Sequence, residues 1–216
     1  MGPEDDNLTL AVLGAAGRTG ERVVAQALER GYAVRGLARR VDRLGEPADR
    51  LTMIEGDARD PDALDRTLAG ADAVISVLAP SNNQPEYAVA QATRLLISRM
   101  AEHGIDRLLV TAGAGVRHPQ DRPGLVDRFI RGLLLLMARA VYTDMKEAVD
   151  VVRSSGLAWT VVRVPRLLDG PATGELRVGY LGEGVGVSLS RGDLASFLVE
   201  IVDPPKYLGE MPVVSS

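Results

Sequence analysis

The stretch "VLGAAGRTGERVVAQAL", residues 12–28, decides the fold. Gly14, Gly17 and Gly20 stand where a hydrophobic run gives way to apolar residues at helical spacing. This pattern indicates a strand, a glycine-rich turn and a helix whose N-terminus offers N–H groups and a positive dipole end to phosphates. We expect Gly14 to permit the sharp turn, Gly17 to let the backbone approach a pyrophosphate, and Gly20 to let the helix pack closely. A purely structural turn is the alternative, but it needs one glycine rather than three.

Strand-like and helix-like segments alternate along most of the chain. Asp60 and Pro61 predict the start of one helix, because aspartate caps helices and proline suits the first helical position. The alternation predicts an α/β fold, a doubly wound (Rossmann) and mainly parallel sheet with helices on both faces. The predicted strands are 8–14, 33–38, 51–57, 72–79, 106–113 and 158–164, and the predicted helices are 18–31, 60–70, 86–104 and a long pattern over 125–155.

The remaining segments differ in composition from this alternating pattern. Residues 1–7 are polar and acidic, and we expect them to be disordered and not to form a signal peptide. Residues 8–216 read as one NAD(P)-binding domain, within which 166–216 are richer in glycine and proline. There we expect a strand at 174–180, a helix at 192–202 and a final strand at "MPVV". This segment is interpreted as a small cap on the substrate side of the sheet.

Composition narrows the function classes. The chain has 216 residues, is 46% hydrophobic, carries a net charge of −4 and has no basic tract, so nucleic acid is not an expected partner. With no cysteine and only His103 and His118 among the histidines, we expect no metal site. The most apolar run, "LLLLM" at 133–137, is far shorter than the ~20 residues that span a bilayer. A cytoplasmic protein acting on a small molecule is expected. The "LLLLM" run is interpreted as core or a homodimer face, with a partner interface as the alternative.

The end of the second predicted strand selects the nucleotide. NAD-selective sites place an acidic residue there for the ribose 2′-hydroxyl, whereas this strand ends in "GLARR", with Arg39 and Arg40. Guanidinium groups suit an anionic 2′-phosphate, which favours NADP(H). Arg39 is the stronger candidate because it directly follows the strand. In a chain with 23 arginines and 2 lysines, a pair of surface arginines is the alternative interpretation.

Two further strand ends carry candidate cofactor contacts. Asp57, after the third strand, is positioned to accept a hydrogen bond from an adenine amino group, with Ala58 beside the ring. An ordinary loop aspartate is nearly as good an interpretation. The fourth strand ends in "SVLAP", residues 76–80, whose small residues would let a ribose lie against the backbone.

A tyrosine and a lysine form a candidate catalytic pair in "YTDMK". Tyr142 and Lys146 are four residues apart, so on a helix they share one face. Tyrosine can act as a general acid toward a carbonyl, while a nearby ammonium lowers the phenol pKa and can hold a ribose. An exposed helical pair is the alternative. The fifth strand ends in "VTAGAG", where only Thr111 offers a hydroxyl to orient a substrate oxygen.

Together the glycine pattern, "GLAR", "GD", "YxxxK" and "SSGLAWTVVRVPRLLDGPATG" (154–174) resemble the atypical short-chain dehydrogenase/reductases. The nearest resemblance is to their NmrA-like and biliverdin/flavin reductase-like branch, over roughly residues 8–214. The resemblance implies that Arg39 binds the 2′-phosphate, that Asp57 and Ala58 flank the adenine, and that backbone around Arg166 faces the nicotinamide. The other cofactor contacts that it implies are Gly14, Ala16, Gly17, Arg18, Thr19, Gly20, Leu78, Ala79, Pro165 and Leu167.

The chain departs from this family where Ala112 and Gly113 stand in place of the usual serine. The leading hypothesis is an NADPH-dependent reductase that delivers hydride to a flavin, a quinone or an enone-like or carbonyl acceptor. Tyr142 would donate or polarise, Lys146 would hold the ribose and Thr111 would orient the substrate. One alternative is an NADP(H)-sensing module without turnover. The other is a non-redox tailoring enzyme, such as an epimerase or isomerase.

Overall fold

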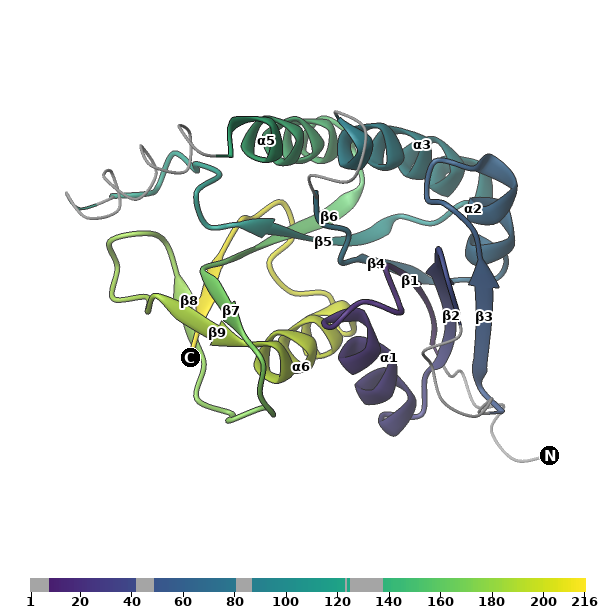
Figure 1. Ribbon diagram of the computed structural model, residues 1–216, viewed down its shortest axis with the longest axis horizontal. Coiled ribbons are helices and arrows are strands. Elements are labelled where there is room, and N and C mark those ends of the chain that lie inside the picture. Colours follow the sequence, from purple (N-terminus) through teal and green to yellow (C-terminus); the bar gives the residue numbers. More distant parts are fainter. Residues whose placement is uncertain (1–7, 42–48, 81–86, 123, 125–137) are drawn as a thin grey trace.

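An eight-stranded sheet forms the centre of the computed structural model, which describes residues 8–41, 49–80, 87–122, 124 and 138–216 (Figure 1). The strand order is β3-β2-β1-β4-β5-β6-β10-β8, and neighbours from β3 to β10 are parallel, whereas β8 is antiparallel. The bounds are β1 Thr9–Leu13, β2 Ala33–Ala38, β3 Leu51–Glu55, β4 Ala73–Ser76, β5 Arg107–Gly113, β6 Ala158–Val164, β8 Arg177–Gly179 and β10 Val213–Ser215.

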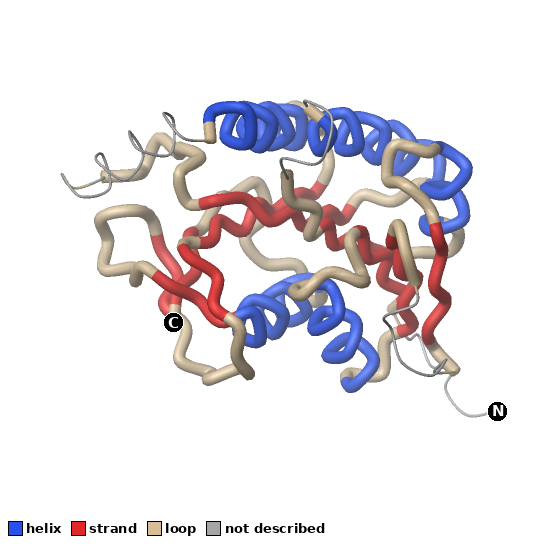
Figure 2. Tube along the Cα trace, in the orientation of Figure 1, coloured by secondary structure: helices blue, strands red, loops and turns tan. Residues whose placement is uncertain are grey.

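Helices cover both faces of this sheet (Figure 2). One face carries α2 (Pro61–Leu68), α3 (Ala88–His103) and α5 (Arg139–Arg153), and the other carries α1 (Gly20–Glu29) and α6 (Arg191–Val202). On each face the helices pack in pairs, α3 against α5 and α1 against α6. The predicted doubly wound architecture is therefore confirmed. The helix α5 lies within the helical pattern predicted over 125–155, and the "LLLLM" run is outside the described residues, as are residues 1–7.

Local sequence signals account for several element boundaries. Asp60 is the N-cap of α2 and accepts a hydrogen bond from the Asp62 amide at 3.1 Å, and Pro61 is the first helical residue. Gly104 ends α3 in the left-handed conformation, with φ of 69°. The first boundary is the one that Asp60 and Pro61 predict, and the second follows the preference of glycine for helix ends.

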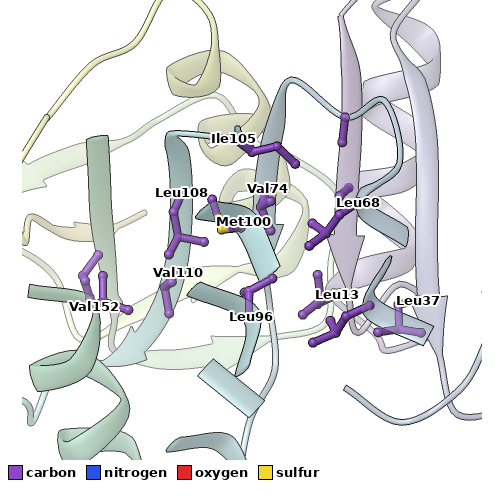
Figure 3. Packing of buried hydrophobic residues seen from close by; sticks show 14 of the residues in the cluster. Leu13, Leu37, Leu68, Val74, Leu96, Met100, Ile105, Leu108, Val110 and Val152 are labelled. Carbon is purple, nitrogen blue, oxygen red and sulfur yellow. The ribbon is translucent and has the colours of Figure 1, made fainter. Parts of the chain in front are cut away.

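The core has two layers, one on each side of the sheet. On one side Leu96 and Met100 of α3 lie beside Val74 of β4 and Leu108 of β5 (Figure 3). On the other side, apolar residues of α1 and α6 pack against alternate strand residues, including Leu109 of β5. Successive side chains of a strand point to opposite faces, so a strand buried on both faces reads as a continuous apolar run.

The C-terminal segment, which we expect to be a small cap within the single domain, contributes to two sheets. Two strands that the sequence did not predict, β7 (Arg166–Leu168) and β9 (Ser188–Ser190), pair with each other in a second, two-stranded sheet. However, β10 and β8 extend the main sheet and α6 covers one of its faces. Among the described residues, no helix combines the length and apolar character that crossing a membrane requires.

Candidate functional site

A cleft of about 740 Å³ crosses the carboxyl ends of the strands from β3 to β6. Parallel sheets bind ligands at this edge, where the strand order reverses between β1 and β4. The structure brings most of the residues predicted from the sequence to the lining of this one cleft. They are Gly14, Ala16, Gly17, Arg18, Thr19, Gly20, Arg39, Arg40, Asp57, Ala58, Leu78, Ala79, Thr111 and Leu167.

The glycine-rich turn has the shape of a phosphate cradle. Gly14 has φ of +81°, and its amide donates to the Leu37 carbonyl at 3.0 Å, so the turn is tied to the end of β2. A Cβ on Gly20 would lie 2.1 Å from the Gly14 carbonyl oxygen, so only glycine lets α1 start this close to β1. Thr19, the N-cap of α1, makes no side-chain capping bond. Thr19 and Gly20 both line the cleft, so the N-terminus of α1 faces it with its positive dipole end.

Basic side chains gather at the end of the cleft formed by β2 and β3. Arg39 and Arg40 are exposed directly after β2, and Arg59 follows β3. The Arg59 guanidinium binds Asp57 through Nε to Oδ1 and Nη2 to Oδ2, both at 2.8 Å. These hydrogen bonds, aided by the charge of Arg39, lower the pKa of Asp57 from 3.8 to about 2 against the opposing effect of burial. The predicted adenine acceptor is thus an ionised carboxylate already paired with an arginine.

The charge of the cleft is opposite to that of the chain. Its charged lining residues in the described part of the chain are five arginines and one aspartate: Arg18, Arg39, Arg40, Arg59, Arg191 and Asp57. The whole chain, in contrast, has a net charge of −4. A positive cleft in an acidic protein attracts anionic ligands such as dinucleotides.

The middle of the cleft is made by the ends of β4 and β5 and by the first turns of α3. Leu78, Ala79 and Val89 line it, and Val89 and Ala90 donate their amides to the buried Asp144 carboxylate at 3.2 and 2.8 Å. Asp144 lies on α5, so one helix supplies the N-terminal cap of another. This contact fixes α3 where it borders the cleft.

The predicted catalytic residues are not brought together. Thr111 lines the cleft and is half-buried, but the side chains of Tyr142 and Lys146 are not part of the lining. Met145 is the residue of α5 that lines the cleft. Because successive side chains of a helix point in different directions, the next residue, Lys146, points outward. There Lys146 Nζ binds Asp150 at 2.6 Å, which raises the lysine pKa. The ring of Tyr142 instead lies beside the loop after β5, with Cε2 3.9 Å from where a Cβ on Gly115 would be.

The cleft continues past β6 on the side of α6. Leu167 of β7 lines it, as predicted, whereas Pro165 does not. Arg191 and Leu194 of α6 also line it and were not anticipated, because nothing in the local sequence shows that α6 packs beside α1. Arg59 was missed as well, although an arginine two residues after a strand-end aspartate offers a weak signal.

Comparisons with known proteins agree with this geometry. A family model described as NAD(P)H-binding matches residues 14–205. Cinnamoyl-CoA reductase 1 of Arabidopsis thaliana is 30% identical over 118 residues, which cover 50% of this chain and 34% of the reductase. The (4-alkanoyl-5-oxo-2,5-dihydrofuran-3-yl)methyl phosphate reductase of Streptomyces griseus is 29% identical over 154 residues, which cover 71% of this chain and 46% of that enzyme. The matched region thus spans less than half the length of either relative.

A solved structure shares the whole fold. The short-chain dehydrogenase/reductase of Veillonella parvula in complex with NADP superimposes with a TM-score of 0.82 at 17% identity, over 97% of this chain and 94% of that one. This likeness confirms the fold that was expected from the sequence, over nearly the whole chain. The chain belongs to the NAD(P)H-binding family.

Proposed function

We propose that this protein is an NADPH-dependent reductase that transfers hydride to a small conjugated or carbonyl acceptor, such as a flavin, a quinone or an enone. The observation that carries the proposal is the arrangement of charge in the cleft. Arg39 and Arg40 stand where NAD-selective sites have an acid. Among the described residues, Asp57 is the one carboxylate that lines the cleft, and Arg59 neutralises it. This end of the cleft suits a ribose that carries a 2′-phosphate.

The described residues fit the cofactor along the length of the cleft. The glycine turn and the N-terminus of α1 would hold the pyrophosphate, and Arg39 and Arg40 would hold the 2′-phosphate. Ala58 would lie beside the adenine, and Leu78 and Ala79 would contact the ribose region. When bound, NADPH supplies a hydride from its dihydronicotinamide ring.

The acceptor would lie beyond β5, between Thr111, Met145 and the α6 side of the cleft. The Thr111 hydroxyl would hydrogen-bond an acceptor oxygen. Ala112 and Gly113, which also line the cleft, have no polar side chain. The acceptor gains one hydride and one proton, and the proton would come from water in the open cleft. Both named relatives are reductases, and the name of one specifies a phosphate ester as its substrate.

The test is the oxidation of NADPH by the purified protein, followed by the loss of dihydronicotinamide absorbance. The acceptor panel comprises a flavin, a quinone, an enone and an aldehyde, each tested with NADPH and with NADH. We expect turnover with at least one acceptor and a preference for NADPH. If NADPH binds tightly but no acceptor is reduced, the reductase proposal is wrong and the sensing module takes its place.

Cofactor choice gives a sharper prediction. Arg39→Gln removes a cation from the proposed 2′-phosphate site, so we expect the Kd for NADPH to rise about tenfold while the Kd for NADH stays nearly constant. Fluorescence titration measures both constants without any turnover. Arg35→Gln is the matched control, because Arg35 lies in β2, the strand that Arg39 follows, but binds the Arg66 carbonyl and does not line the cleft. Equal weakening of both nucleotides by Arg39→Gln would contradict the assignment.

A further inference from the structure

Two arginines of the cleft converge on one carboxylate. Arg18, in the glycine turn, binds Asp169 Oδ2 through Nη1 at 3.2 Å, and Arg191, at the start of α6, binds Oδ1 through Nη1 at 2.9 Å. Both arginines line the cleft, whereas Asp169 does not. The Arg191 side chain is only 10% exposed, while Asp169 is 57% exposed. A solvent-facing carboxylate thus bridges two cationic groups, one from the glycine turn and one from the start of α6.

The loop that carries Asp169 is fixed on α6. The buried Asp193 carboxylate accepts hydrogen bonds from the amides of Thr173 and Gly174 at 2.7 and 3.0 Å. Burial alone would raise the pKa of Asp193, but these hydrogen bonds hold the pKa below its usual value. A Cβ on Gly192 would lie 2.2 Å from the Ala172 amide nitrogen, so the loop packs directly on the helix backbone. The fold therefore determines where Asp169 meets the two arginines.

The chemistry of this contact favours exchange of the carboxylate. An exposed ion pair gains little from its Coulomb attraction, so Asp169 is easily displaced from Arg18. Arg191, in contrast, is largely buried, and a buried guanidinium needs an anionic partner. Any group that displaces Asp169 must therefore bring a negatively charged oxygen of its own.

We propose that Arg18 and Arg191 form an oxyanion clamp, that Asp169 fills this clamp in the free protein, and that an anionic group of a bound ligand takes its place. Two ligands can supply such a group: the pyrophosphate of the cofactor, or the carboxylate or phosphate of an anionic acceptor. The second source rests on the proposed reductase function and would define its substrates as anionic. Leu167 and Leu194, which also line the cleft on the α6 side, would border the apolar part of that acceptor.

The test uses two variants whose effects have opposite signs. Asp169→Asn removes the competing carboxylate, so it should tighten oxyanion binding severalfold. Arg191→Gln removes half of the clamp and should weaken the same binding about tenfold. Glu200→Gln is the matched control. Glu200 lies on α6 and forms an exposed ion pair with Lys206, so its substitution makes the same kind of change as Asp169→Asn. A general loss of folding by one variant cannot produce the predicted tightening by the other.

Calorimetric titrations identify the source of the oxyanion. NADPH is titrated into the free protein, and trans-cinnamate and its neutral methyl ester are titrated into the NADPH-saturated protein. If the two variants shift the Kd for NADPH in opposite directions, the pyrophosphate occupies the clamp. If they shift only the Kd for cinnamate and not for the ester, the clamp receives the acceptor. If Asp169→Asn tightens the binding of neither NADPH nor cinnamate, the proposal is overturned. These titrations need no turnover, so they remain decisive even where the reductase assay fails.

Discussion

At the scale of single residues, pairing decides what a charged side chain can offer to a ligand. Asp57 was predicted as a free hydrogen-bond acceptor for adenine, but both of its carboxylate oxygens bind Arg59. A carboxylate oxygen can accept more than one hydrogen bond, so a contact with adenine remains compatible with this pair. The pairing also keeps Asp57 from opposing the 2′-phosphate electrostatically.

The Arg59 pairing predicts a measurable pKa change. In Arg59→Gln, the pKa of Asp57 should rise from about 2 toward 3.8, because the charge-assisted hydrogen bonds that favour its ionised form are lost. Carboxyl NMR titration of the variant and of the parent protein measures this shift. Arg40→Gln is the control, since it removes another arginine of the cleft and leaves both hydrogen bonds from Arg59 to Asp57 in place. An unchanged titration in Arg59→Gln would contradict the geometry.

A second prediction at this scale concerns the tyrosine–lysine pair. Because neither side chain lines the cleft and Lys146 binds Asp150, we expect Tyr142→Phe and Lys146→Met to retain NADPH affinity and turnover. Thr111→Val, inside the cleft, should instead raise the KM for the acceptor. A large loss of activity in Lys146→Met, with none in Asp150→Asn, would show that the lysine reaches the cofactor after all.

At the scale of elements, the position of one helix depends on a side chain from another. Tyr87, the residue before α3, has a positive φ of 57° and makes no side-chain cap, and Asp144 of α5 binds the first amides of the helix instead. The contact is buried, so water cannot replace it. It joins the two helices on the face of the sheet where they border the cleft.

Removing this cap should cost stability. We expect Asp144→Ala to lower the free energy of unfolding by about 2 kcal/mol, because a cap is lost and buried amides are left unpaired. Urea denaturation followed by circular dichroism measures the change. Asp150→Asn, on the same helix but exposed, should stay within about 0.5 kcal/mol of the parent protein. A similar small change for Asp144→Ala would mean that other contacts hold α3.

At the scale of the whole molecule, one buried ion pair joins segments that are distant in sequence. Arg163 of β6 has a fully buried side chain and binds both carboxylate oxygens of Asp121 at 2.7 and 2.8 Å. It also donates to the carbonyls of Val116 and Met211. The loop after β5, the strand β6 and the segment before β10 are therefore tied together.

Breaking this pair gives a prediction with a definite pH dependence. We expect Asp121→Asn to cost about 3–5 kcal/mol at pH 7, because Arg163 is left buried without its counter-ion. Burial raises the pKa of Asp121, but the hydrogen bonds from Arg163 and from nearby amides outweigh this effect and lower the pKa below 3.8. Its stabilising contribution is thus present above pH 3.8 and is lost as the pH falls through the folded-state pKa. Denaturation at several pH values should show the parent and the variant converging in acid, whereas a constant difference would contradict this account.

The sequence alone determined that the sheet is mainly parallel, where along the chain the first six strands and the helices between them lie, and the glycine turn. These features depend on local periodicity, capping residues and glycine spacing, all of which are visible within a few residues of one another. It also placed Arg39, Arg40 and Thr111 correctly on the cleft, because strand ends of a parallel sheet gather at one edge.

Tertiary structure alone decided which side chains meet. The short strands β7 and β9 are defined only by pairing with each other, for instance Leu167 with Leu189 across more than twenty residues of chain. The contacts of Asp169 with Arg18 and Arg191, and of Asp144 with α3, likewise join distant segments. Helical spacing placed Tyr142 and Lys146 on one face, but the rotation of α5 against the sheet turned Met145 to the cleft. That rotation is set by packing along the whole helix, so no local pattern contains it.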